Sequence, residues 1–184
     1  MIFHTKNNHS ALLRTLDSGD LDRLSDYLQG LSPDTRKRFG PHPFDRQSIV
    51  DFYSTKAHQA YVAQDLETGN LVAYSIVRMG YLEHDRPRLE SWGIYPSHET
   101  DCTFAPSVAD AWQSCGLGNA LFHFVMADLK TKGIRRIILW GGVQSDNDKV
   151  VRFYLKNGFR IAGEFQYNGN NYDMVLECNL SENS

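Results

Sequence analysis

A glycine-containing loop between a β-rich run and an amphipathic helix constrains the fold of this 184-residue chain more than any other feature. Residues 101–108 form the β-rich run, and apolar residues recur at helical spacing over 116–132 until Gly133 ends the pattern. The loop between them reads Trp112-Gln113-Ser114-Cys115-Gly116-Leu117-Gly118-Asn119. A strand that leads through such a loop into a helix is typical of domains that mix strands and helices.

The segment before residue 55 is expected to be helical. Three helices are expected there, over about 21–31, 33–40 and 45–53. Ser18 or Asp20 would cap the first of them. Ser32 followed by Pro33 is typical of an N-cap with proline in the first turn, and Asp45 would cap the third helix.

From residue 59 onward the pattern alternates between strand and helix. Strands are expected over 59–65, 71–79, 101–108, 134–140, 159–166 and 172–179, and helices over 116–132 and 146–157. Asn168-Gly169 favours a hairpin between the last two strands. Pro106 donates no ladder hydrogen bond, which predicts a bulge or a free strand edge there. The aromatic residues of segment 80–100 indicate a piece of strand or a loop folded over the sheet.

Composition narrows the class of protein. Hydrophobic residues make up 41% and charged residues 22%, which is ordinary for a globular chain, and the length predicts one domain over 1–184. The net charge of −3 argues against nucleic acid and anionic membranes as partners. Three widely spaced cysteines without a C-x-x-C pair predict neither a disulfide framework nor a metal site, and the cytoplasm is the expected compartment. Of these, Cys102 is interpreted as a buried structural thiol.

The loop has the chemistry of a phosphate site. Unpaired N–H groups at a helix N-terminus, with the helix dipole behind them, favour an anion, and glycine allows a ligand to approach the backbone closely. Taken alone, the loop is equally well explained as a plain turn. A nucleotide P-loop would need Gly-Lys-Ser or Gly-Lys-Thr, and a dinucleotide fingerprint would need glycine where Leu121 stands, so both are excluded.

A second segment, residues 147–159, reads Asn-Asp-Lys-Val-Val-Arg-Phe-Tyr-Leu-Lys-Asn-Gly-Phe. Together the two segments resemble the GNAT N-acetyltransferase superfamily. Its phosphate loop has the form Gln/Arg-x-x-Gly-x-Gly/Ala, and its later helix has the form Asn-x-x-Ala-x-x-Leu-Tyr-x-Lys-x-Gly-Phe. The matching residues are Gln113, Gly116, Gly118, Asn147, Tyr154, Lys156, Gly158 and Phe159, with apolar replacements at Val150 and Phe153.

The resemblance implies the fold and the cofactor. It implies an α/β (α+β) domain with a mixed, mostly antiparallel sheet of about six or seven strands and helices on both faces. It also implies acetyl-CoA as cosubstrate and no metal. The residues it assigns to the cofactor are Ser107, Val108, Gln113, Ser114, Cys115, Gly116, Leu117, Gly118, Asn119 and Asn147. Cys115 departs from the family, which often has Arg or Lys there, so one phosphate-facing charge is missing.

The resemblance also implies a reaction in which an amine attacks the thioester carbonyl directly. Tyr154 matches the tyrosine that protonates the departing thiolate. A phenol with a pKa of about 10 can protonate a thiolate whose conjugate acid has a pKa near 8.5. Glu99 and Asp101, and also Glu90, are candidates for the base that takes the proton of the amine, although solvated surface charge explains each of them as well.

The acceptor is expected to be a small-molecule amine or a protein amine. Phe39, His42 and Phe44 are candidate substrate contacts, because the loop after the first helices often borders the acceptor pocket in this family. Packing beneath that loop is the alternative for all three. The alternative function is a non-catalytic acyl-CoA-binding or regulatory module on the same fold. A homodimer is compatible with either function.

Overall fold

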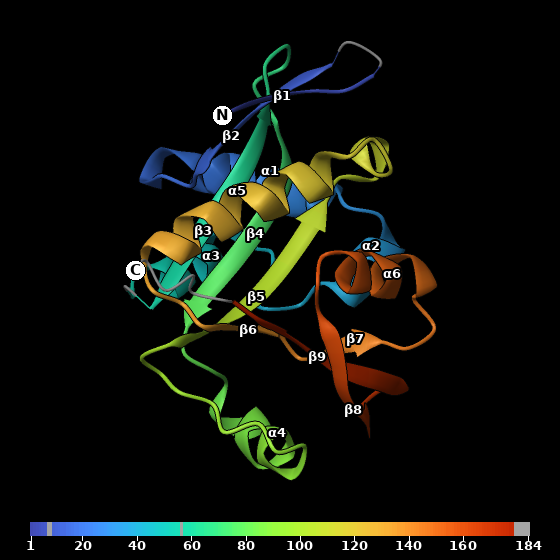
Figure 1. Cartoon of the computed structure of the whole chain (residues 1–184). Helices are drawn as coiled ribbons and strands as arrows, with labels where there is room; N and C mark the ends of the chain where they lie inside the picture. Colours follow the sequence, from blue (N-terminus) through green and yellow to red (C-terminus); the bar gives the residue numbers. More distant parts are fainter. Residues whose placement is uncertain (7–8, 56, 179–184) are drawn as a thin grey trace, which may run out of the picture. The chain divides into compact units, whose positions relative to one another are not determined.

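The strands of the computed structural model hydrogen-bond in the order β1-β2-β3-β4-β5-β6-β9-β7, and β8 pairs with β9 (Figure 1). The structure describes residues 1–6, 9–55 and 57–178. The strands are β1 (Ile2–His4), β2 (Ser10–Thr15), β3 (His58–Asp65), β4 (Leu71–Met79), β5 (Asp101–Val108), β6 (Arg136–Leu139), β7 (Val143–Gln144), β8 (Arg160–Gln166) and β9 (Asn170–Glu177). The helices are α1 (Leu21–Gly30), α2 (Pro33–Arg38), α3 (Arg46–Tyr53), α4 (Arg86–Ser91), α5 (Leu117–Thr131) and α6 (Asp148–Lys156). Three 3-10 turns complete them, η1 (Ser18–Asp20), η2 (Glu83–Asp85) and η3 (Asp110–Trp112).

The chain divides into two units, Met1–Val77 with Ala105–Asp128 and Arg78–Phe104 with Leu129–Ser184. In the first unit β2 runs antiparallel to β1 and to β3. In the second unit β5 and β6 are parallel, and β9 is antiparallel to β6, β7 and β8. Among the described residues, the predicted mixed and mostly antiparallel sheet is therefore confirmed, with nine strands rather than six or seven. A single domain over 1–184 stays a prediction.

The first two strands correct the expectation that the segment before residue 55 is helical. Ala11 and Leu13 on β2 are fully buried, whereas the residues between and beside them are partly exposed. This period of two is the burial pattern of a strand with one face toward the core. The register pairs Leu13 with Ala63 of β3, so a contact 50 residues away decides the structure of this segment.

Helices cover both faces of the sheet in the first unit, as predicted (Figure 1). α5 lies on one face, where Phe124 contacts the Tyr61 ring of β3 at 6.2 Å between ring centroids. α1 and α3 lie on the other face, where the Tyr27 hydroxyl is 2.9 Å from the Ser107 hydroxyl of β5. Leu28 of α1 is fully buried there, as its helical spacing predicts.

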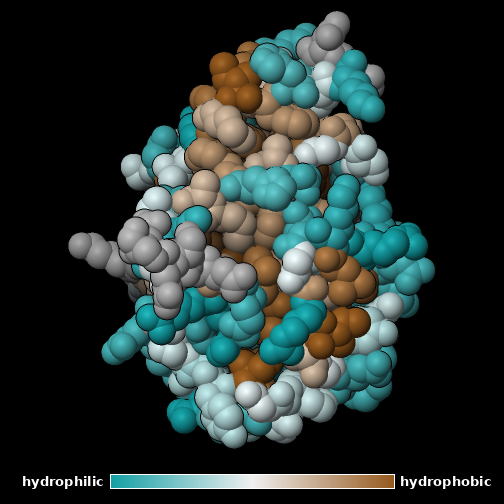
Figure 2. All heavy atoms as spheres, viewed as in Figure 1, coloured by the Kyte–Doolittle hydropathy of each residue, from teal (hydrophilic) through white to brown (hydrophobic). Residues whose placement is uncertain are grey.

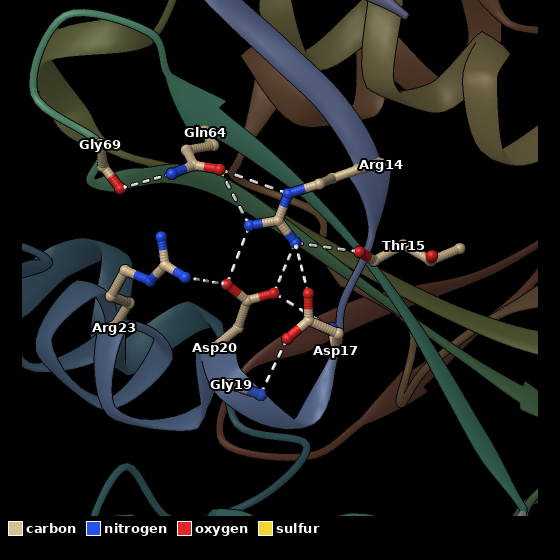
Figure 3. A network of polar contacts seen from close by, with 8 residues as sticks. All are labelled: Arg14, Thr15, Asp17, Gly19, Asp20, Arg23, Gln64 and Gly69. Carbon is tan, nitrogen blue, oxygen red and sulfur yellow. Dashed lines mark hydrogen bonds and ion pairs between the residues drawn. The ribbon is translucent and has the colours of Figure 1, made fainter.

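A buried carboxylate attaches the start of α1 to β2 (Figure 3). The Arg14 guanidinium of β2 donates to both oxygens of Asp20, with Nη2 2.8 Å from Oδ1, and it also donates to Gln64 of β3. Arg23 adds a second cation 3.0 Å from Asp20. Asp20, one of the two expected caps, is the N-cap residue of α1, but its side chain makes no capping bond to that helix. It closes the capping box of η1 instead, whose N-cap is Asp17.

Local signals elsewhere are confirmed. Ser32 and Asp45 each accept a hydrogen bond from the backbone N–H three residues later, so they cap α2 and α3. The β8–β9 hairpin turns at Asn168 and Gly169, whose φ values are 49° and 118°. Such left-handed residues are what a tight hairpin turn requires.

Segment 80–100 contains the turn η2 and the short helix α4 and no piece of strand, so of the two expected alternatives the strand is wrong. In the second unit Arg88 of α4 donates to Asp173 of β9 at 2.6 Å and to Asp85 at 2.8 Å. The Trp92 indole N–H donates to the same Asp173 at 3.0 Å, and the Arg88 guanidinium lies 3.8 Å from the centre of the Phe165 ring of β8. The segment therefore packs on the β8–β9 hairpin through buried polar contacts that periodicity does not reveal.

The surface of the second unit carries apolar side chains around α6 and the β8–β9 hairpin (Figure 2). Leu155 of α6 and Ile161 of β8 are 46% and 40% exposed. No helix in the described ranges is long and apolar enough to cross a bilayer.

Candidate functional site

The loop between β5 and α5 has an unusual backbone. After the turn η3 it passes through Ser114 at φ 62° and Gly116 at φ 93°. The left-handed region costs glycine little and strains a residue with a side chain. The first bond of α5 runs from the Ala120 N–H to the Gly116 carbonyl at 3.0 Å. The N–H groups of residues 117–119 therefore have no acceptor within the helix.

These N–H groups give the loop the chemistry of an anion site. The positive end of the α5 dipole lies at the same place, and turns with a left-handed residue form concave surfaces lined by amides. A Cβ added at Gly118 would lie 3.5 Å from Val108 Cγ2, which is an ordinary contact. The protein thus has room for a methyl group at 118, in keeping with the Gly/Ala of the family motif.

Two side chains of the loop bond to backbone carbonyls close by in the chain. The Gln113 amide donates to the Val108 carbonyl at 3.3 Å, and the Cys115 thiol donates to the Trp112 carbonyl at 2.9 Å. Cys115 thus helps to hold the turn at the position where the family often has a cation. The loop offers an anion mainly its backbone donors.

The strand that leads to the loop extends beyond its parallel neighbour. The β5–β6 ladder ends at the pair Phe104–Leu139, where β6 ends, and β5 continues to Val108. Within the described residues no other strand pairs with β5 on this side past Phe104, which agrees with a free edge, one of the two alternatives expected at Pro106. The Ser107 hydroxyl lies 3.4 Å from the Tyr74 carbonyl and bonds to the Tyr27 hydroxyl. Its side chain therefore points into the protein interior.

Asn147 and Tyr154, the other motif residues, belong to the second unit and share helix α6. Asn147 is the N-cap residue, but its side chain makes no capping bond. Tyr154 is 5% exposed, and its ring lies 5.1 Å from that of Phe159. Burial raises the pKa of Tyr154, so the phenol keeps its proton at neutral pH. Its hydroxyl has no hydrogen-bond partner among the residues that the structure describes.

The candidate bases differ in their surroundings. Asp101 is 2% exposed and accepts from the Ser97 N–H at 2.9 Å and from Arg136 at 3.3 Å. Glu90 pairs with Arg86 on the surface of α4. Glu99 is exposed, and its carboxylate makes no ion pair within residues 1–6, 9–55 and 57–178.

The candidate acceptor residues gather around a tyrosine of β4 that the sequence did not single out. His42 Nε2 lies 3.0 Å from the Tyr74 hydroxyl, and His42 Nδ1 lies 2.6 Å from the Pro43 carbonyl. A carbonyl only accepts, so Nδ1 carries the proton and Nε2 accepts from Tyr74. Phe39 packs against the same ring at 5.8 Å. Burial lowers the pKa of His42.

This arrangement agrees with the packing alternative for two of the three residues. Phe39 and His42 are 5% and 7% exposed, whereas Phe44 is half-buried. The Tyr53 hydroxyl of α3 also bonds to the Tyr74 hydroxyl. The sequence shows Tyr74 only as part of an apolar strand, so no local signal could have revealed this cluster.

A cavity of about 270 Å³ adjoins the start of the loop. Its lining residues are Arg23, Asp26, Tyr27, Gly30, Leu31, Asn70, Leu71 and Ala109. Within the described part of the chain, no group of three or more His, Cys, Asp or Glu residues could hold a metal ion. Cys102 is buried, as expected, and burial raises the pKa of its thiol.

Comparison with known proteins agrees with the motif. The model of the acetyltransferase (GNAT) family matches residues 24–159. A mycothiol acetyltransferase of Corynebacterium efficiens is 34% identical over 71 residues, which are 39% of this chain and 23% of that protein. The match thus spans about a quarter of the relative's length.

Solved structures share the fold. The GNAT domain of S. lividans PAT superposes with a TM-score of 0.72 at 18% identity, over 97% of this chain and 96% of that chain. The spermidine N-acetyltransferase of Vibrio cholerae, solved in complex with CoA and spermine, has a TM-score of 0.65 at 19% identity, over 91% and 95% of the two chains.

Proposed function

Because the chain belongs to the GNAT acetyltransferase family, we propose that it moves an acetyl group from acetyl-CoA to a primary amine. The observation that carries this proposal is the loop before α5, whose N–H groups at 117–119 have no acceptor within the helix. The name of the Vibrio cholerae relative, an N-acetyltransferase, supports an amine as the acceptor.

The loop residues fit the diphosphate of coenzyme A. Leu117, Gly118 and Asn119 would donate their backbone N–H groups, while Gln113 and Cys115 hold the turn. The remaining loop residues assigned to the cofactor are Ser114 and Gly116. The backbone of Ser107 and Val108, beyond the end of β6, would pair with the pantetheine arm. The Asn147 amide, which makes no capping bond to α6, would add a side-chain contact.

The bound cosubstrate supplies a thioester carbonyl to the amine. Holding the two reactants in line removes much of the entropic barrier. As the C–S bond breaks, Tyr154 gives its phenolic proton to the departing thiolate sulfur. Two features support this role: the buried phenol carries its proton at neutral pH, and its hydroxyl makes no hydrogen bond to the described residues.

A carboxylate would accept the proton that the amine must lose. Asp101 and Glu99 are the two candidates, and their surroundings favour Glu99. Asp101 is already bonded to Arg136 and Ser97, whereas Glu99 is exposed and makes no ion pair with the described residues. Replacing Glu99 with Gln should therefore raise the pH at which the amine reacts.

A thermal-shift measurement with acetyl-CoA tests the cofactor. At one hundred times its dissociation constant a ligand adds about 2.7 kcal/mol of stability, which in a domain of this size raises the midpoint by roughly 5–10 °C. No shift with either acetyl-CoA or free coenzyme A would contradict the proposal.

Turnover separates the enzyme from the alternative, a non-catalytic acyl-CoA-binding or regulatory module. Thiol release is measured with small amines, amino sugars, polyamines and peptides. Release that depends on both the amine and Tyr154 supports the enzyme. A thermal shift without turnover on any of these amines favours the binding module.

A further inference from the structure

Asp110, in the turn that opens the loop, is bonded to a segment 78 residues earlier in the chain. One carboxylate oxygen, Oδ2, accepts from the Ser32 N–H at 3.0 Å. The other, Oδ1, accepts from the hydroxyls of Ser32 and Thr35, both at 2.9 Å. These hydrogen bonds lower the pKa of Asp110, so it is a carboxylate at neutral pH.

The same carboxylate reaches toward the loop. The Gln113 amide lies 3.5 Å from Asp110 Oδ1 and 3.3 Å from the Val108 carbonyl. Gln113 immediately precedes Ser114, a residue with a side chain held at φ 62°. Such a conformation persists only where its surroundings constrain it.

On the other side, Asp110 holds the start of α2. The Arg36 guanidinium donates to the Leu31 carbonyl at 2.9 Å, so the α1–α2 junction is bonded to α2 itself. α2 ends at Arg38, and the next residues include Phe39 and His42, which pack on Tyr74. α2 is therefore the direct chain connection between the Asp110 contacts and residues 39–44.

We propose that Asp110 is a positioning residue that couples occupancy of the phosphate loop to the placement of α2 and residues 39–44. The inference rests on the proposed function, because coenzyme A is the ligand that would order the loop. A ligand that favours the ordered loop also favours the Asp110 contacts. By thermodynamic linkage, the factor by which the bound ligand strengthens the Asp110 contacts equals the factor by which those contacts strengthen ligand binding. Loss of the contacts therefore weakens binding by that factor.

Hydrogen exchange with and without free coenzyme A tests the coupling. In the wild type, coenzyme A should slow exchange of the amides of 117–120 and, about 5-fold or more, those of 33–40. In Asp110→Ala, saturating coenzyme A should still slow exchange at 117–120, but it should no longer slow exchange at 33–40. Thr35→Val removes one of the three bonds and leaves the Ser32 cap in place, so it should reduce the effect at 33–40.

Asp45→Ala is the matched control. Asp45 also accepts from a backbone N–H and a hydroxyl, both of Ser48, but it does so within α3. It should leave the coupling intact.

The outcomes separate the coupling from the proposed function. Equal protection of 33–40 in wild type and Asp110→Ala overturns the coupling, as does protection confined to 117–120 in the wild type. Either result leaves the proposed function standing. Absence of coenzyme A binding overturns both.

Discussion

Gly116 and Gly118 occupy the same loop for different physical reasons. Gly116 has φ 93°, a conformation that strains any residue with a side chain. Gly118 is the second residue of α5, where a methyl group would make an ordinary contact with Val108. The structure itself therefore requires glycine only at 116, and position 118 can be varied to test ligand binding.

Gly118→Asp should lower the affinity for acetyl-CoA at least about tenfold, a loss of about 1.4 kcal/mol. The new carboxylate would lie among the N–H groups of residues 117–119 and repel the diphosphate. The same charge at a helix N-terminus should stabilise the free protein by about 0.3–1 kcal/mol. Calorimetric titration and urea denaturation measure the two effects. Gly118→Ala is the control that should keep both affinity and fold, and unchanged affinity in Gly118→Asp would remove the loop from the cofactor site.

Tyr154→Phe should lower kcat about 100-fold or more, because a positioned general acid contributes at least that factor. The KM for acetyl-CoA should change little. Stability should also change little, because the ring packing is kept and the hydroxyl has no described partner. Steady-state kinetics with thiol detection measure the effect. Tyr61→Phe, which removes a tyrosine hydroxyl bonded to Asp128, is the control, and equal turnover in both variants would contradict the role of Tyr154.

At the scale of elements, α4 is attached to the β8–β9 hairpin by a buried carboxylate as well as by apolar packing, in which Leu89 and Val175 share one core cluster. Asp173 is 2% exposed and accepts from both Arg88 and Trp92. Gly163 of β8 permits this packing, because a Cβ there would lie 2.3 Å from the Trp92 ring. The polar segment 80–100 is therefore ordered by its partner strands rather than by its own periodicity.

Asp173→Ala should destabilise the protein by about 2–4 kcal/mol, because it leaves Arg88 and the Trp92 N–H without their main acceptor. Arg88 still donates a hydrogen bond to Asp85 in this variant, which limits the loss of stability. Urea denaturation measures the change. Glu90→Ala removes the exposed pair with Arg86 and should cost less than about 1 kcal/mol. Equal effects of the two substitutions would show that Asp173 does not hold α4.

At the scale of the whole molecule, His42 should make stability depend on pH. Burial lowers its pKa below the ordinary value of about 6.5, although Asp45 opposes the shift and Tyr53 and Tyr74 face the ring. The unfolded chain therefore takes up a proton near that pH that the folded protein does not. The free energy of unfolding should be constant above about pH 6.5 and fall as the pH is lowered.

Urea denaturation of wild type and His42→Gln at several pH values between 5 and 8 measures this contribution. The difference between the two curves should shrink as the pH falls, because only the wild type loses stability through His42. If the free energy of unfolding of the two proteins changes with pH in parallel, His42 does not make this contribution. Below about pH 4 a second loss is expected in both proteins, because Arg14 holds the pKa of Asp20 below its usual range.

Several turns, helix caps and the glycine loop could be predicted from the amino-acid sequence alone. The Ser32 and Asp45 caps, the Asn168-Gly169 turn and the glycine loop all depend on the backbone chemistry of a few neighbouring residues. Such signals are readable without a fold, because each residue supplies its own φ preference or its own hydrogen-bonding group. The motif spacing then identified the family.

The hydrogen-bond partners of the site side chains, in contrast, depend on the packing of distant elements. Asp101 and Arg136 are 35 residues apart, and Asp110 and Ser32 are 78 residues apart. The register of β5 with β6 and the packing of α2 bring these pairs together. Contacts of this kind leave no periodic trace in the chain, because they depend on how distant elements align rather than on the order of neighbouring residues.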